Sequence, residues 1–85
     1  MARIIDFGKT NIVGKNVRAI RKKNRMSQQI LSAKLELMGV YVCRGSISRI
    51  EDGSRTVTDI EIYSLAQVLG VEIPALFAGA EEIFK

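Results

Sequence analysis

The sequence contains no histidine and only one cysteine, Cys43, among its 85 residues. A single cysteine excludes an intrachain disulfide, and without histidine nothing resembles a zinc site, which takes several Cys or His ligands. The lack of histidine also excludes the Ser-His and Cys-His pairs of nucleophilic catalysis, and the chain has no glycine-rich phosphate loop or clustered carboxylate pair. We therefore expect no metal, no cofactor and no enzymatic activity.

Long apolar runs are missing as well. No run approaches the roughly 20 residues of a membrane-spanning helix, and the N-terminus lacks the apolar stretch and cleavage site of a secretory signal. With 47% hydrophobic and 26% charged residues, the composition is that of one ordinary soluble domain. We expect a cytoplasmic protein without membrane contact, in which Cys43 is a small buried hydrophobe or, alternatively, an exposed redox-sensitive thiol.

The net charge of +4 conceals an uneven distribution. Residues 9–55 hold eleven Lys or Arg against three Asp or Glu, a net charge of +8, whereas residues 56–85 hold one Lys against five Asp or Glu, a net charge of −4. A basic half beside an acidic half is typical of a protein that presents one side to a polyanion, most often to phosphates. Charge alone leaves acidic lipids, acidic proteins or a merely solvated face as alternatives.

Apolar residues at helical spacing predict two helices in the first half of the chain. The first covers about residues 13–24, with Val13, Val17 and Ile20 on one side. Ser27 is a good N-cap for the second helix, and Gly39 supplies its left-handed stop. The apolar stripe of the second helix consists of Leu31, Leu35 and Met38. Residues 40–42 then form an extended connector whose valines tuck inward.

A third helix is predicted over residues 44–51. It places Ile47 and Ile50 on one side, because successive helical residues are rotated by about 100°. The opposite side carries Gly45, Ser48 and Arg49. Ser48 and Arg49 must therefore face outward.

An ion pair is predicted between the first and third helices. Glu51 lies one turn beyond Ile47, at the border of the apolar stripe, and Arg21 follows Val17 by four residues in the same way. These positions predict that Arg21 and Glu51 meet as a partly buried pair that links the two helices.

The second half of the chain predicts two further helices. Thr58 caps a fourth helix that Gly70 ends, and Pro74 fits the first turn of a short fifth helix. Their inward residues are Ile62, Leu65, Ala66, Leu69, Leu76 and Phe77. Since no strand-helix alternation or internal repeat occurs, the predicted architecture is an all-α, compact bundle of about five short helices.

The two ends of the chain are too apolar to be simple solvated tails. Residues 1–10 form an N-terminal arm, residues 11–78 the domain, and residues 79–85 a C-terminal tail. The apolar residues of these ends are Ile4, Ile5, Phe7, Ile83 and Phe84. Either they pack on the bundle, which we favour, or they are buried against a second subunit or another protein.

Six fragments of the chain follow one another in a characteristic order and spacing. They are Ile20-Arg21, Met26-Ser27-Gln28, residues 46–53, Leu65-Ala66, Leu69-Gly70-Val71 and Leu76-Phe77. Together they resemble the Cro and phage-repressor helix-turn-helix family, also called the XRE family. The resemblance spans roughly residues 13–77 and implies a lambda-repressor-like bundle in a DNA-binding regulator that works as a dimer.

Two features depart from this family. The turn between the second and third helices is longer by about five residues, from Leu37 to Val42. Cys43 stands where Ser or Thr commonly caps the recognition helix, so we expect a cap weaker by about 1 kcal/mol. The longer turn makes the alignment of Arg44 less secure than that of residues 47–53.

A helix in a major groove needs small residues near the bases and long donors toward their acceptors. Arg49 and Arg44 are therefore expected to contact base edges, alongside the small residues Gly45, Ser46 and Ser48. The resemblance implies that Gln28 touches a phosphate and braces the recognition helix. Further phosphate contacts are expected from Arg55, Arg18 and Lys22.

The expected partners are double-stranded DNA and a second copy of the chain, because a single headpiece reads only a few base pairs. Regulation by repression is favoured, since no activating segment is evident. The alternative keeps the fold but makes protein contact primary, as in an antitoxin or an adaptor whose apolar C-terminal tail binds a partner protein.

Overall fold

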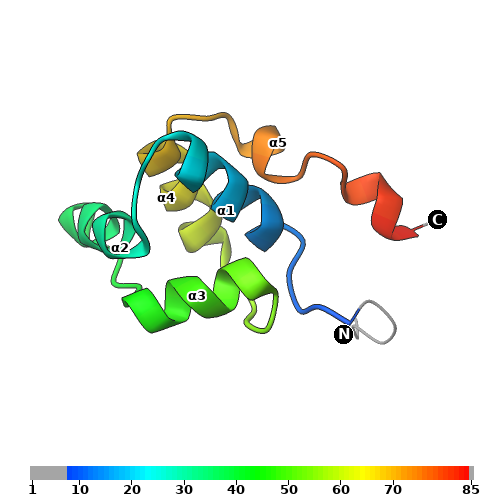
Figure 1. Cartoon of the computed structure of the whole chain (residues 1–85), viewed down its shortest axis with the longest axis horizontal. Helices are drawn as coiled ribbons and strands as arrows, with labels where there is room; N and C mark the ends of the chain where they lie inside the picture. The colour runs from blue at the N-terminus through cyan, green and yellow to red at the C-terminus, as the bar shows by residue number, and fades with distance from the viewer. Residues whose placement is uncertain (1–7, 85) are drawn as a thin grey trace.

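The computed structural model describes residues 8–84, with the backbone alone for residues 83 and 84. These residues form five α-helices and one 3-10 helix, and they include no strand (Figure 1). The predicted all-α bundle is confirmed. In chain order the elements are α1 (Gly14–Lys23), α2 (Gln28–Leu37), α3 (Arg44–Asp52), α4 (Asp59–Leu69), α5 (Ile73–Leu76) and η1 (Ala80–Phe84).

The helices begin and end at the residues that the sequence marks for those roles. Ser27 Oγ accepts a hydrogen bond from the backbone N–H of Ile30 at 3.1 Å, which satisfies a donor in the first turn of α2. Thr58 and Glu61 form a reciprocal capping box at the start of α4. Gly53 and Gly70 end α3 and α4 in the left-handed conformation, with φ of 82° and 72°.

One hydrophobic core joins all five α-helices and the connector between α2 and α3. The connector valine Val42 is buried and Val40 is half-buried, as predicted. Met38 was expected in the core stripe of α2, but it is 44% exposed because α2 ends one residue earlier. The buried apolar residues are Val13, Val17, Leu31, Leu35, Val42, Ile47, Ile50, Leu65, Ala66, Leu69 and Leu76.

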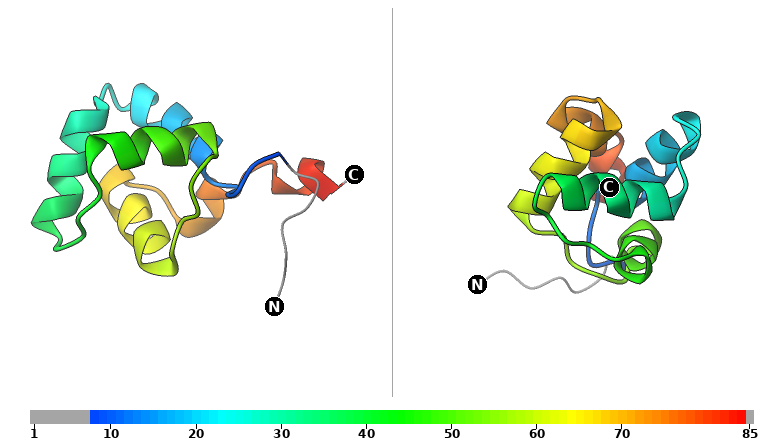
Figure 2. Two further views of the ribbon diagram at one scale, coloured as in Figure 1. Left: turned by 90° about the horizontal axis from the view of Figure 1, so that it is seen from below. Right: turned by 90° about the vertical axis from the view of Figure 1, so that its left-hand side faces the viewer.

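The helices pack so that α3 lies at the surface. α1 packs against α3, α4 and α5, whereas α2 packs against α3 and α4. In Figure 1 α3 lies along the lower edge of the molecule, with α5 on the opposite side. The view from below in Figure 2 shows α3 along its whole length, with no other helix in front of it. Its inner side is covered by the bundle while its outer side remains open.

The three asparagines of the chain connect three helix ends to α1 or to the residues that flank it. The side-chain amides of Asn11, Asn16 and Asn24 donate to carbonyl groups in the last turns of α3, α5 and α4, at 3.0, 2.8 and 3.0 Å. Carbonyl groups at helix ends have no partner within their own helix, so these amides satisfy them. α1 is therefore the element to which the others are attached.

The apolar residues Ile4, Ile5 and Phe7 lie outside the described residues, as do the side chains of Ile83 and Phe84.

Within the described part, no single helix is long and apolar enough to cross a bilayer. α4 and the segment Ile73–Glu82 pass that test only as a pair, and a bend of 101° separates them.

Candidate nucleic-acid interface

α3 separates its residues into a buried side and an open side. Ile47 and Ile50 are each 1% exposed, whereas Arg44, Ser48 and Arg49 are exposed. Gly45 is exposed as well. The predicted division of this helix, with isoleucines inside and arginine outside, is confirmed.

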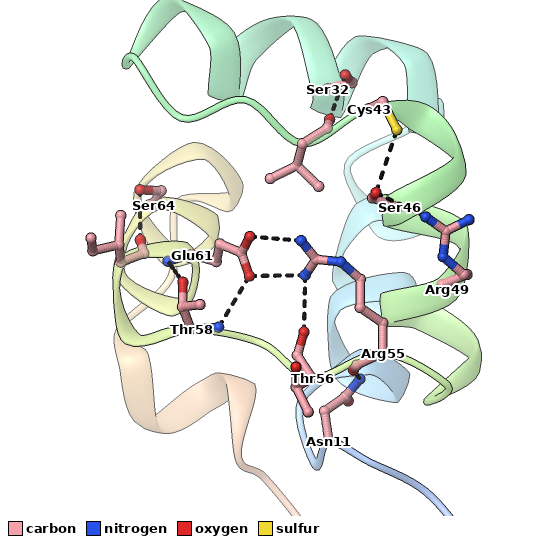
Figure 3. A network of polar contacts seen from close by, with 12 residues as sticks. Asn11, Ser32, Cys43, Ser46, Arg49, Arg55, Thr56, Thr58, Glu61 and Ser64 are labelled. Atoms are coloured by element: carbon pink, nitrogen blue, oxygen red, sulfur yellow. Dashed lines mark hydrogen bonds and ion pairs between the residues drawn. The ribbon is translucent and has the colours of Figure 1, made fainter.

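The Arg49 side chain turns back along α3 toward its N-terminus. Its Nη2 donates to Ser46 Oγ at 3.1 Å, and a Cβ added to Gly45 would lie 3.6 Å from Nη1 (Figure 3). A guanidinium has five N–H donors, so the bond to Ser46 uses one of them. Ser46 itself is half-buried at the edge of the open side, where it holds Arg49. It is thus less open than the other residues predicted to contact bases.

Cys43 is exposed, so the favoured prediction of a buried cysteine is wrong. The residue is the N-cap of α3, and this position projects its side chain outward from the first turn. Its Sγ makes no cap hydrogen bond to the helix backbone, as expected for a weaker cap. A hydrogen bond with Ser46, at 3.4 Å between Sγ and Oγ, lowers the pKa of the Cys43 thiol.

Arg21 and Glu51 form the predicted pair between α1 and α3. Arg21 Nε donates to Glu51 Oε2 at 2.6 Å, and Nη2 donates to Oε1 at 3.0 Å. The two side chains are 9% and 3% exposed. Gln28 Nε2 donates to Glu51 Oε1 at 3.1 Å, and Arg21 Nη1 donates to the carbonyl of Met26. Removing one partner of such a buried pair typically costs about 3–5 kcal/mol, because the other charge is left buried and uncompensated. The pair and its hydrogen bonds therefore fix where α3 meets α1 and the start of α2.

Arg55, predicted to contact a phosphate, is paired with Glu61. Its two Nη atoms donate to the two carboxylate oxygens of Glu61, both at 2.9 Å, and Nη1 also donates to the carbonyl of Thr56 (Figure 3). Glu61 in turn accepts from the backbone N–H of Thr58, at the start of α4. The guanidinium is therefore paired with a carboxylate, which gives Arg55 a structural role, and its contact with a phosphate stays a prediction.

The other predicted phosphate contacts lie beside α3. Arg18 and Lys22 are exposed on α1, and both line a groove whose opposite wall is the C-terminal end of α3. Gln28 is half-buried at the start of α2, where its amide braces Glu51. The structure thus brings Gln28, Arg18 and Lys22 near the same helix as Arg49, whereas the guanidinium of Arg55 is paired with Glu61.

Three residues before α1 were not singled out from the sequence, yet they cap the end of α3. Lys9 Nζ donates to the carbonyl of Asp52 at 2.8 Å. The N–H and hydroxyl of Thr10 donate to the carbonyl of Gly53 at 2.7 and 2.9 Å. Asn11 also accepts from the backbone N–H at the start of α1 at 2.7 Å. An Asn shortly before a helix is a common start signal, so Asn11 alone was open to recognition from the sequence.

Comparison with models of known protein families and with curated proteins found no match to this chain.

Proposed function

We propose that the protein is a sequence-specific, double-stranded DNA-binding regulator of the helix-turn-helix type, which acts in the cytoplasm as a repressor. The single observation that carries this proposal is the exposed side of α3, where small residues flank two arginines. The other side of this helix is packed in the core and held by the Arg21–Glu51 pair. The resemblance of residues 13–77 to the Cro and phage-repressor family supports the same function.

The geometry of α3 suits a DNA major groove, which admits one α-helix. Gly45 and Ser48 let the helix backbone approach the base edges. Arg49 donates two hydrogen bonds to the acceptors of a guanine, and Arg44 reaches bases near the start of the helix. A good contact of this kind contributes about 1–3 kcal/mol of discrimination against the wrong base.

Phosphate contacts orient the helix without reading sequence. Gln28, Arg18 and Lys22 supply these contacts, because their side chains lie beside α3 and are at least partly exposed. Arg55 is left out, since its guanidinium is occupied by Glu61. The Arg21–Glu51 pair keeps the recognition helix in place and does not touch DNA.

A dimer follows from the size of the binding surface. One recognition helix reads only a few base pairs, so two copies on half-sites about 34 Å apart give useful specificity. The operator is then an inverted repeat. We expect the second copy to use an apolar surface outside α3.

Selection of bound duplexes from a random pool tests this function. We expect enrichment of an inverted repeat, and Arg49→Ala should relax the preference at one base position in each half-site. Arg25→Ala is the matched control, because Arg25 is exposed in the turn between α1 and α2 and should leave the selected sequence unchanged. Loss of the same preference in both variants would contradict base reading by Arg49.

A second candidate, an antitoxin or adaptor that works by protein contact, is favoured by apolar side chains left in solvent. Leu37, the last residue of α2, is 88% exposed, and Tyr41 in the turn after it is 76% exposed. Ile60 on α4 is 65% exposed. Such side chains are common at protein interfaces. If the selection enriches no duplex, this candidate replaces the first.

A further inference from the structure

A groove of about 640 Å³ lies between α1 and the C-terminal end of α3. One wall is a face of α1, and the other is formed by the last residues of α3 with the segment that precedes α1. Its apolar part includes Ile12 and Ala19. Its charged residues are Lys9, Lys15, Arg18, Lys22, Glu51 and Asp52.

The groove is positive because four cations line it, while only one of its two carboxylates, that of Asp52, is not paired with a cation. Glu51 is bound by the buried Arg21. Asp52 accepts from the backbone N–H and the hydroxyl of Ser54, at 2.9 and 2.6 Å. Lys9 donates to a backbone carbonyl, which carries no net charge to cancel its own. All four cations of the groove are exposed.

The arrangement of backbone and side chains holds the cations of α1 against α3. Gly14, the first residue of α1, approaches the carbonyl oxygen of Ile50 so closely that a Cβ would overlap it. Asn11 bridges the two elements by donating to that same carbonyl at 3.0 Å. Lys15, Arg18 and Lys22 therefore keep a fixed position relative to the recognition helix.

Asp52 lines the groove and follows the exposed Arg49 by three residues, so the groove begins about one turn of α3 beyond Arg49. The hydrogen bonds from Ser54 lower the pKa of the Asp52 carboxyl, and the charges of Lys9 and Arg49 lower it further. Asp52 is thus within electrostatic reach of one cation of the groove and one of the recognition helix. A long polyanion lying on α3 at Arg49 would meet the cations of the groove about one turn further on, beyond the exposed carboxylate of Asp52.

We propose that this α1–α3 groove holds the phosphate backbone of one DNA strand while α3 occupies the adjacent major groove. The inference rests on the proposed function, and it adds Lys9 and Lys15 to the phosphate contacts. A duplex is the polyanion favoured here because its phosphates repeat along a line, as the cations of α1 do, and because the groove begins about one turn of α3 beyond Arg49. Its apolar part is suited to deoxyribose.

Two neighbouring lysines of α1 provide a matched test. Lys22 lines the groove, whereas Lys23 is equally exposed but is not among the lining residues. Lys22→Gln and Lys23→Gln each remove one positive charge from the same helix turn. Binding of the full chain to a selected duplex and to a random duplex of equal length is followed by fluorescence anisotropy over a series of salt concentrations.

We expect Lys22→Gln to reduce the slope of log affinity against log salt by about 0.9, equally for both duplexes, and the Arg18→Gln/Lys22→Gln double variant to reduce it by about 1.8. Lys23→Gln should leave the slope near that of the parent chain. Equal slopes for Lys22→Gln and Lys23→Gln, with sequence preference intact, would overturn the groove while the proposed function survives.

The opposite result is also informative. If no duplex is preferred but Lys22→Gln still reduces the slope more than Lys23→Gln, the groove is supported as a backbone site and the sequence-specific function fails. If the parent chain binds neither duplex, both proposals are overturned.

Discussion

Among single residues, Gly14 must lack a side chain, for a reason that its position in the sequence does not show. It is buried at the first turn of α1, and the space that a side chain would fill is occupied by the carbonyl group of Ile50. A backbone group cannot move aside as a flexible side chain can. Glycine is therefore needed here for close approach of two helices rather than for an unusual backbone angle.

We predict that Gly14→Ala destabilises the protein by at least about 1–3 kcal/mol, because it forces α1 away from α3. Gly45→Ala is the control, since its Cβ would meet Arg49 Nη1 at an ordinary 3.6 Å. That change should stabilise an exposed helix by about 0.5–1 kcal/mol. Urea unfolding followed by circular dichroism measures both, and a loss of stability for Gly45→Ala alone would contradict the argument.

At the scale of elements, two ion pairs with different surroundings position α3 and α4. The Arg21–Glu51 pair joins α1 to α3 in the interior. The Arg55–Glu61 pair joins the loop after α3 to the first turn of α4, with side chains 28% and 12% exposed. Since Glu61 also belongs to the capping box of Thr58, this one carboxylate fixes both the loop and the start of α4.

The second pair predicts a pH dependence. The hydrogen bonds from Arg55 hold the pKa of Glu61 below its ordinary value of 4.5. The folded state therefore favours the charged carboxylate, so the pair stabilises the protein above about pH 4.5 and this stability is lost as the pH falls through the lowered pKa.

Glu61→Gln should cost about 1–2 kcal/mol at neutral pH, and this cost should shrink as the pH falls from 7 through the lowered pKa, because the wild-type side chain then becomes protonated. Thermal unfolding over this pH range measures the difference. Glu36→Gln, at an exposed position of α2, should follow the parent chain throughout. A constant difference between Glu61→Gln and the parent down to pH 3 would show that the carboxylate charge is not the cause.

For the whole molecule, hydrogen bonds from the asparagine amides connect α1 and its flanking residues to the ends of α3, α4 and α5. Asn16 Nδ2 donates to the carbonyls of Leu76 and Ala78, at 2.8 and 2.9 Å, and so attaches α5 and the chain after it. α5 has four residues, which is too short to be stable as an isolated helix. Its place in the fold depends on the burial of Leu76 and on this amide.

We predict that Asn16→Ala lowers the free energy of unfolding by about 0.5–1.5 kcal/mol per lost hydrogen bond. Hydrogen exchange should show the loss first in α5, with α2 and α3 less affected. Gln29→Ala, at an exposed position of α2, is the control. Uniform loss of protection over all helices would indicate that α5 unfolds only with the rest of the molecule.

Most of the fold was predictable because its determinants are local or periodic. Ser27, Thr58, Gly53 and Gly70 act through their own backbone or the next turn, and helical spacing selects the buried residues without knowledge of their partners. The pair of Arg21 with Glu51 was within reach of sequence reasoning for the same reason. Each residue borders an apolar stripe, and two bordering charges of opposite sign meet when the stripes pack.

The surroundings of other side chains depend on the residues that the fold places opposite them. Arg55 and Arg49 are both arginines near the end of α3, and nothing in the local sequence shows that one turns toward Glu61 while the other lies along its own helix. Cys43 is apolar enough for a core, but the first turn of α3 directs it to solvent. Lys9 was counted only as charge, although it caps α3 from 43 residues away.

Sequence alone determined which segments form helices, where these helices end and which of their sides are apolar. It also determined that positive charge is concentrated in the first part of the chain. These properties depend on neighbours within one or two turns. Tertiary packing decided which cations remain open to solvent, which glycine permits contact between helices, and that α1 and α3 enclose a positive groove. Each of these properties arises only where two segments distant in the sequence meet. The reason is that the exposure of a side chain and the shape of a surface depend on which atoms the fold places next to them.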